Sequence, residues 1–308
     1  MSTRSQLLAL NDELRRLKAG GQRAISVTDE SLDQLRAMVR TESDEARAPV
    51  TSPAVAAEVA VAVTPRPSAP APVVRAAAPV PGVAPIPTEP PAIDLPEGDK
   101  AVRWAALREL VVNHPVCRAH IRPGKQVVFG VGSLDAPIFF CGEAPGADEE
   151  VQGEPFVGPA GQLLTRMIQG MGLKREQVYI GNIMNWRPEM PAVHGGVQVG
   201  NRPPTPEEMN FCLPFLRTQL AIVQPQVIVA LGKTAAEGLL GHGTFKAVGE
   251  VRGRWRTFGS WPLIVTYHPS YILRNQSNSS KRAIWEDLLK VMERVALPIS
   301  DKQRNYFL

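Results

Sequence analysis

Residues 137–161 read PIFFCGEAPGADEEVQGEPFVGPAG and contain the pattern that decides the fold. The apolar run at 137–142 stops at a glycine and passes into a polar, glycine-rich loop. Similar runs recur at residues 178–184 (VYIGNIM), 227–232 (VIVALG) and 262–267 (PLIVTY). Short apolar runs bounded by turn residues are typical of strands buried on both faces of a sheet.

Helical patterns lie between these four runs. Apolar residues spaced for a helix predict helices over residues 100–114, 161–171, 206–223 and 233–240. Strands that alternate with helices imply crossover connections and parallel pairing. The sequence therefore predicts an α/β protein, a three-layer α/β/α sandwich around a central four-stranded parallel sheet.

The proline distribution divides the 308 residues into unlike parts. Of 29 prolines, 13 fall between Pro49 and Pro96. Proline lacks a backbone N–H and fixes φ, so residues 48–98 are predicted to be a disordered Ala/Pro-rich linker. Residues 1–47 hold two short helical patterns, at 3–19 and 29–38, which form either a marginal tail or a docking site for a partner protein. Residues 99–308 are the predicted folded domain.

Charge and cysteine content limit the class of protein. Residues 1–98 carry 10 Lys+Arg and 12 Asp+Glu, whereas residues 99–308 carry 24 and 18, a net charge of +6. A basic domain suggests a polyanionic partner. No apolar run reaches the roughly 18 residues of a membrane span, and the N-terminus lacks a signal-peptide core. Three cysteines make no disulfide framework, so we expect a cytoplasmic protein.

Ligands of parallel sheets bind where the strands end, which selects residues 142–146, 182–185, 232–233 and 268–270. The acids after the first run either act on water or a cation, or form a solvated turn. Phe156 is either a core residue or a stacking platform for a planar ligand. Asn182 either bonds its own loop or reads the edge of an amide-like base. His268 is either structural or donates a hydrogen bond to a developing oxyanion.

Five motifs occur in one order along residues 99–295. They read GEAPGADEEVQGEPFVGPAGQLL from 142, YIGNIMNWRP from 179, NRPPTPEE from 201, IVALGKTAAEGLLG from 228 and TYHPSYILRN from 266. In these motifs the sequence resembles the uracil-DNA glycosylase superfamily, and most closely the class called family 4. The resemblance implies an enzyme that hydrolyses the N-glycosidic bond of uracil in DNA after flipping the nucleotide out of the helix.

The resemblance also implies roles for single residues. Phe156 would stack on the flipped uracil, Asn182 would read its pyrimidine edge, and His268 would stabilise the leaving uracil anion. Glu143 would assist water attack or stabilise the sugar cation. Four further residues complete the substrate-binding set, either as an anion nest of backbone amides or as polar loop organisers: Gly142, Ala144, Glu149 and Asn201.

The last motif is expected to contact DNA through Ser270, Ile272, Leu273 and Arg274. Ile272 or Leu273 would act as an apolar wedge in the minor groove, and Arg274 would lie on a phosphate. We expect DNA containing uracil as the partner, no membrane, and a monomer. Two rival functions are a non-catalytic DNA-binding module and a glycosylase for another deaminated base, such as hypoxanthine or xanthine.

Two features depart from the family pattern. Family members usually carry an iron–sulfur cluster held by four cysteines, and here Cys117 and Cys212 match two of them, while His120 and Trp186 stand at the other two. We expect no cofactor, with Cys117, His120 and Cys212 as weak metal candidates. The second departure is a longer loop, EMPAVHGGVQVG at residues 189–200.

Overall fold

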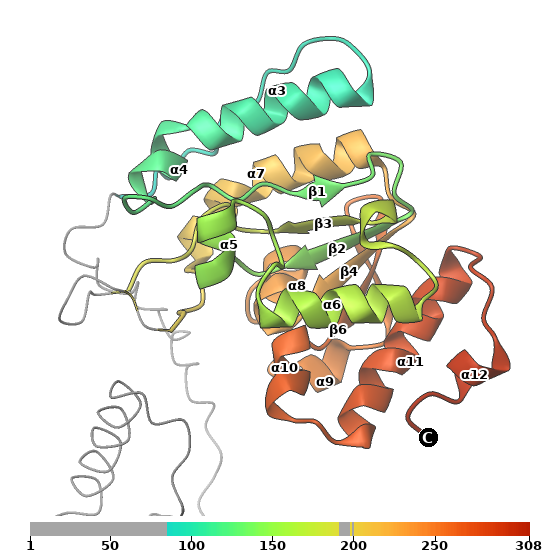
Figure 1. The fold of residues 1–308 in the computed structure, drawn as a ribbon. Helices are drawn as coiled ribbons and strands as arrows, with labels where there is room; N and C mark the ends of the chain where they lie inside the picture. The colour runs from blue at the N-terminus through green and yellow to red at the C-terminus, as the bar shows by residue number, and fades with distance from the viewer. Residues whose placement is uncertain (1–84, 191–197, 199) are drawn as a thin grey trace, which may run out of the picture. The chain divides into compact units, whose positions relative to one another are not determined.

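A computed structural model describes residues 85–190, 198 and 200–308 (Figure 1). The two N-terminal helical patterns and most of the proline-rich segment lie outside the described residues, as does most of the 189–200 loop. Among the helices described, none is both long and apolar enough to cross a membrane.

A mixed six-stranded sheet in the order β1-β3-β2-β4-β6-β5 forms the centre of the domain. Its four inner strands are parallel: β3 (Tyr179–Asn182), β2 (Ile138–Gly142), β4 (Val227–Leu231) and β6 (Trp261–Thr266). They coincide with the four apolar runs, so the predicted parallel sheet is confirmed. Because the strands are parallel, the residues after each of them come to one edge.

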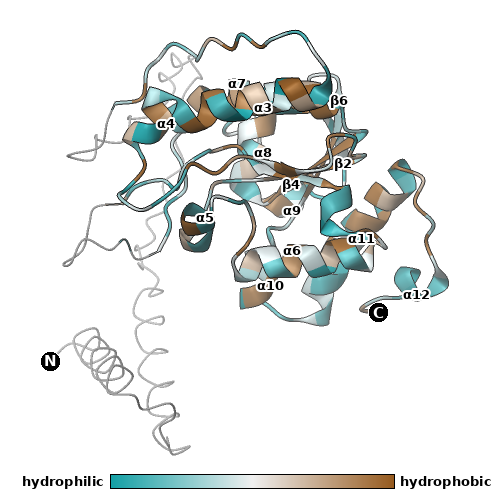
Figure 2. Cartoon of the chain, turned by 45° about the horizontal axis from the view of Figure 1, so that its top comes forward, coloured by the Kyte–Doolittle hydropathy of each residue, from teal (hydrophilic) through white to brown (hydrophobic). Residues whose placement is uncertain are grey.

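Side chains alternate between the two faces of the sheet along each strand, and a core cluster buries each face. On β2, Phe139 and Cys141 join one core cluster, while Ile138 and Phe140 join the other. The first cluster packs against α3 (Lys100–Asn113), α7 (Pro206–Val223) and α8 (Lys233–Leu240). The second packs against α6 (Pro159–Gly170) and α11 (Asn278–Arg294). The three layers are visible in Figure 1, and Figure 2 shows hydrophobic residues along the central strands.

The predicted helices are confirmed with small shifts at their ends. Helix α7 begins at the capping box of Thr205 and Glu208 and ends at Gln224, which has a left-handed backbone. The shorter elements are α4 (Pro115–Ala119), α5 (Ala147–Gln152), η1 (Arg175–Gln177), α9 (Val248–Val251), α10 (Pro269–Arg274) and α12 (Asp301–Arg304).

Two antiparallel edge strands lie beyond the four predicted ones. Strand β5 (Trp255–Phe258) forms a hairpin with β6 across Gly259-Ser260. The sequence pattern does not predict β5, because polar residues within the strand interrupt any apolar run. Strand β1 (Val131–Gly132) has two residues and pairs with β3. At Gly132 a Cβ would lie 2.0 Å from the carbonyl oxygen of Val178, so this approach requires glycine.

The end of the segment predicted as linker is packed rather than free. Residues 85–98 contain no helix or strand, but Ile86, Ile93 and Leu95 pack against the first core cluster. The proline content of this stretch predicts disorder, but its three large apolar side chains are spaced so that each packs on the surface of the first core cluster. The packed domain therefore begins before the predicted boundary at residue 99.

Candidate active site

A pocket of about 520 Å³ opens at the edge where the four parallel strands end. Its wall includes nine of the twelve residues predicted for the site: Glu143, Ala144, Glu149, Phe156, Asn182, Asn201, His268, Ser270 and Arg274. These residues come from five separate stretches of the chain, which the parallel sheet brings to one place. Gly142, Ile272 and Leu273 lie outside the pocket wall.

Gly142 and Asn182 pair across β2 and β3 at the floor of the pocket. A Cβ on Gly142 would lie 2.3 Å from Oδ1 of Asn182 and 2.5 Å from Cζ of Phe156, so glycine is required for both side chains to approach. Asn182 is 7% exposed, and its Oδ1 has no hydrogen-bond partner among the described residues. A buried amide oxygen without a partner is rare in folded proteins and suggests that a ligand supplies the missing donor.

The neighbouring Asn185 shows the structural alternative that the sequence leaves open for asparagines in this motif. Its Nδ2 donates to the carbonyl oxygen of Val128, and its backbone carbonyl accepts from the Val128 N–H. The Oδ1 of Asn185 also lacks a partner within the described part of the chain, but this residue does not line the pocket. Asn185 therefore fastens its loop, whereas the Asn182 side chain faces the pocket.

Phe156 lies in the loop between α5 and α6 in a left-handed conformation, with φ of 55°. Glu149 holds this loop: its Oε1 accepts from the N–H groups of Val157 and Gly158, and its Oε2 accepts from Gly146. The Phe156 backbone leaves no room for a Cβ at Gly161, where the gap would be 1.9 Å. The ring is thereby fixed with its centroid 5.6 Å from that of His268, at an interplanar angle of 29°.

His268 follows β6 and forms the N-cap of α10. Its Nδ1 accepts from the backbone N–H of Ser270 at 3.1 Å and lies 2.9 Å from the Ser270 hydroxyl. Burial, aided by the charge of Arg274, lowers the pKa of His268 to about 4. The ring is therefore neutral at pH 7, and because Nδ1 is an acceptor, the ring proton is on Nε2.

Glu143 directly follows β2 and is half-buried in the pocket wall. Burial raises the pKa of its carboxyl group, a hydrogen bond from the Thr234 side chain lowers it, and the charge of Glu237 raises it further. A carboxylate with a raised pKa is a better proton acceptor than one in water, which suits a general base.

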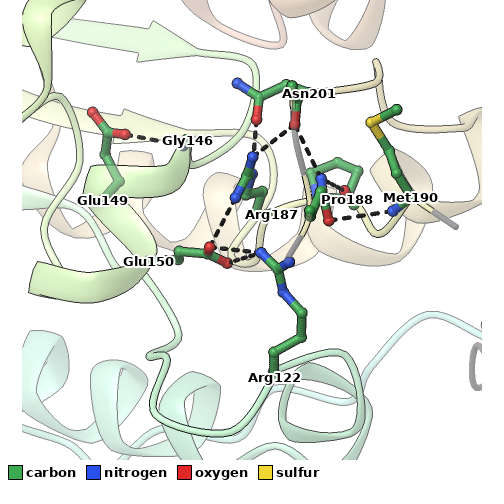
Figure 3. A network of polar contacts seen from close by, with 10 residues as sticks. Arg122, Gly146, Glu149, Glu150, Arg187, Pro188, Met190 and Asn201 are labelled. Carbon is green, nitrogen blue, oxygen red and sulfur yellow. Dashed lines mark hydrogen bonds and ion pairs between the residues drawn. The ribbon is translucent and has the colours of Figure 1, made fainter. Parts of the chain in front are cut away.

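A network of ion pairs and hydrogen bonds around the buried Glu150 and Arg187 reaches the pocket residue Asn201 (Figure 3). Glu150 pairs with Nη2 of Arg122 and with Nη1 of Arg187 at 2.9 Å. Arg187 in turn donates from Nε to Oδ1 of Asn201 at 2.7 Å and from Nη2 to the carbonyl oxygen of Gly200. Asn201 is thus placed on the pocket wall by a residue 14 positions earlier. The acidic run 148–150 is visible in the sequence, but nothing there marks Glu150 as the partner of two arginines.

The segment expected to contact DNA forms helix α10. Ile272 is 7% exposed and belongs to the second core cluster, so it is not available as a wedge. Leu273 is 38% exposed and is the apolar side chain that faces solvent here. The helix itself decides this, because adjacent residues point about 100° apart and only one of them faces the core.

Lys233 and Thr234 also line the pocket, although they are not in the predicted set. They begin α8 directly after β4, so the strand-end rule is sufficient to find them. Arg202 lines it as well and forms an ion pair with Glu208 at 2.7 Å.

The position of the family's iron–sulfur cluster does not offer a matching ligand set. The ring of Trp186 stacks on that of His120, with centroids 4.9 Å apart and an angle of 9°. Cys117 and Cys212 are fully buried free thiols, and burial raises the pKa of Cys117 to about 12. Among the described residues, no three His, Cys, Asp or Glu side chains gather as a metal site. Indole is not a ligand of iron, so these residues do not fit the cluster.

Comparison with known proteins agrees with this geometry. Residues 129–289 match the family model of the uracil DNA glycosylase superfamily. The chain is 42% identical over 185 residues to a type-4 uracil-DNA glycosylase of Thermotoga maritima, an alignment that covers 59% of this chain and 89% of the relative. It is 43% identical over 150 residues to a type-4 uracil-DNA glycosylase of Archaeoglobus fulgidus, covering 47% of this chain and 70% of the relative.

The fold and pocket are therefore those of a DNA glycosylase-like α/β domain. The chain belongs to the uracil-DNA glycosylase superfamily, and its relatives place it beside the type-4 class.

Proposed function

We propose that this protein is a DNA repair enzyme that hydrolyses the N-glycosidic bond of uracil in DNA. Family membership supports the reaction. The observation that carries the proposal is the buried Asn182 amide, whose Oδ1 lacks a partner among the described residues, in one pocket with Phe156 and His268.

The pocket offers groups complementary to uracil. Uracil presents a donor at N3 and acceptors at O2 and O4. The Asn182 amide supplies an acceptor for N3–H and a donor for O4, while the Phe156 ring offers an apolar face to the planar base. Cytosine has an acceptor at N3 and a donor at its amino group, so it would leave the amide with mismatched partners, which costs affinity.

Departure of the base is assisted by His268. When the C1′–N1 bond breaks, its electron pair stays on uracil, and negative charge develops on the ring and on O2. The neutral Nε2–H of His268 donates a hydrogen bond to that oxygen. Because its pKa is about 4, His268 stabilises the anion without transferring a proton.

The sugar left behind is an oxocarbenium-like cation at C1′. The Glu143 carboxylate stabilises this charge and accepts a proton from the water that attacks C1′. The products are free uracil and an abasic site. Flipping of the nucleotide costs a few kcal/mol, and the exposed Leu273 fills the vacated space in the stack.

The activity is tested on a uracil-containing oligonucleotide cleaved by alkali after excision. Wild type is expected to cleave, and Asn182→Ala and His268→Ala to lose cleavage while retaining the fold. Binding without cleavage by the wild type would favour a non-catalytic module. In a panel that includes hypoxanthine and xanthine, uracil as the poorest substrate would overturn the proposed specificity.

We also propose that the enzyme works without an iron–sulfur cluster. The stacked rings of His120 and Trp186 occupy the place of two cysteines, and excision needs no redox step. Wild type treated with iron and sulfide under reducing conditions should stay colourless, whereas the double variant His120→Cys/Trp186→Cys regains the four-cysteine set and the visible absorption of a cluster. Cluster absorption in the wild type would refute this.

The remaining expectations are also proposals. Three free, buried cysteines are consistent with a reducing compartment, and we propose the cytoplasm. We propose a monomer whose N-terminal 47 residues are either a marginal tail or a docking site for a partner protein.

A further inference from the structure

A second concave site lies beside the active pocket and has no role in the excision chemistry. This cavity of about 380 Å³ is formed by α3, α4 and the chain that follows α4. We call it the basic pocket after its four cationic side chains, Arg108, Arg118, Arg122 and Lys125. Its described wall includes no Asp or Glu.

Most of the positive charge in the basic pocket is uncompensated. Arg122 is compensated, since it pairs with Glu150, which also pairs with Arg187, and lies near the carboxyl group of Glu189. In the part of the chain that the structure describes, Arg108, Arg118 and Lys125 form no ion pair. Four cations around a cavity repel one another, and this repulsion is relieved when an anion enters.

The basic pocket is joined to the active pocket by α5. The first turn of α5 lines the active pocket, and Gly153, which ends the helix, lines the basic pocket. Gln126 fixes this junction, since its backbone N–H donates to the carbonyl oxygen of Glu150 and its Nε2 to that of Val151. Figures 1 and 2 show α4 and α5 near each other, while α10 lies in the other helical layer, beside α6.

We propose that the basic pocket binds a backbone phosphate of the DNA that carries the flipped nucleotide, several nucleotides away from it. This inference rests on the proposed function. Arginine guanidinium groups match the geometry of phosphate oxygens, and duplex DNA presents a phosphate about every 3.4 Å along each strand. A single active pocket holds one nucleotide, so a second anchor at the other end of α5 fixes the register of the duplex without reading its sequence.

Such an anchor contributes to affinity for long DNA and leaves the chemistry unchanged. Each phosphate that is neutralised adds about 0.9 to the magnitude of the slope of log K against log salt for duplex DNA. A short uracil oligonucleotide that ends before the basic pocket gains nothing from it.

The test removes three charges that take no part in the Glu150 network. The variant is Arg108→Gln/Arg118→Gln/Lys125→Gln. The matched control, Lys174→Gln/Arg294→Gln/Lys302→Gln, changes the net charge equally at exposed residues that line neither pocket. Affinity for a long uracil-free duplex is measured across a salt series, excision is measured on a short single-stranded uracil oligonucleotide, and thermal melting checks the fold.

The triple variant should bind the long duplex more weakly, and the magnitude of its salt slope should fall by about 0.9 for each phosphate that it no longer neutralises. Its excision of the short substrate should equal that of wild type. A slope equal to that of the charge-matched control overturns the proposal, as does stabilisation of the wild type by inorganic phosphate without any change in slope. Absence of wild-type excision on the short substrate would instead refute the proposed function, so the two failures are distinguishable.

Discussion

Replacement of Trp186 by alanine tests how this domain holds together where relatives carry a metal cluster. Trp186 is fully buried in the first core cluster, stacked on His120 and 6.1 Å from the ring of Phe211. Truncation of a buried tryptophan costs about 3–5 kcal/mol through reduced burial and the cavity left behind. A domain of this size loses about 2–4 °C of melting temperature per kcal/mol, so we expect a fall of roughly 6–20 °C.

A second substitution at the same position separates packing from hydrogen bonding. The Nε1 of Trp186 is buried without a partner in the described residues. An unsatisfied buried donor costs about 1–3 kcal/mol. Trp186→Phe removes that donor and keeps most of the ring, so it should destabilise much less than Trp186→Ala.

Calorimetric melting of both variants is compared with Trp255→Ala, whose side chain is 39% exposed on the edge strand β5. If Trp186→Ala melts within a degree or two of Trp255→Ala, the ring does not brace this region and our account of its packing is wrong.

Three further outcomes follow from the site and the domain boundary. The folded-state pKa of His268 is depressed to about 4 from 6.5, so its contribution is full above pH 6.5 and is lost as pH falls toward 4. Asp287, whose pKa is raised to about 6, has the opposite pH dependence in this window, so the test compares proteins: by chemical denaturation, wild type should lose about 3 kcal/mol more than His268→Asn and the same as His242→Asn. Gly142→Ala should slow single-turnover excision by about 100-fold, because the new Cβ displaces the Asn182 amide and the Phe156 ring. Gly249→Ala should leave the rate unchanged, because the atom nearest to its Cβ is 3.7 Å away. A chain that begins at residue 85 should retain full excision and stability; one that begins at residue 99 should melt lower, since it lacks three packed apolar side chains.

The four inner strands were predictable because short stretches of sequence are sufficient to identify each of them. Each inner strand is an apolar run, and each run is buried on both faces by helices whose own periodicity is visible. The edge strands were not, because β5 is mostly exposed and β1 has two residues, so neither carries a pattern of burial. The packing of Ile93 likewise depends on a surface built by distant helices.

For the site, the strand-end rule and the motifs together located the pocket residues. Local periodicity did not choose between Ile272 and Leu273, since both are apolar and adjacent. The orientation of α10 against the core buries the first and exposes the second. The roles of Asn182 and Asn185 divide in the same way, because only the second meets a backbone carbonyl of another segment.

By itself, the sequence determined the order of the four inner strands and the main helices along the chain, the family, and the absence of two cysteines from the four-ligand pattern. These depend on residue type and spacing along the chain. The tertiary structure decided which polar groups remain without partners among the described residues, which of two apolar neighbours faces solvent, and that Arg108, Arg118 and Lys125 surround one cavity beside the active pocket. Those properties depend on distances between segments far apart in sequence, which only folding sets.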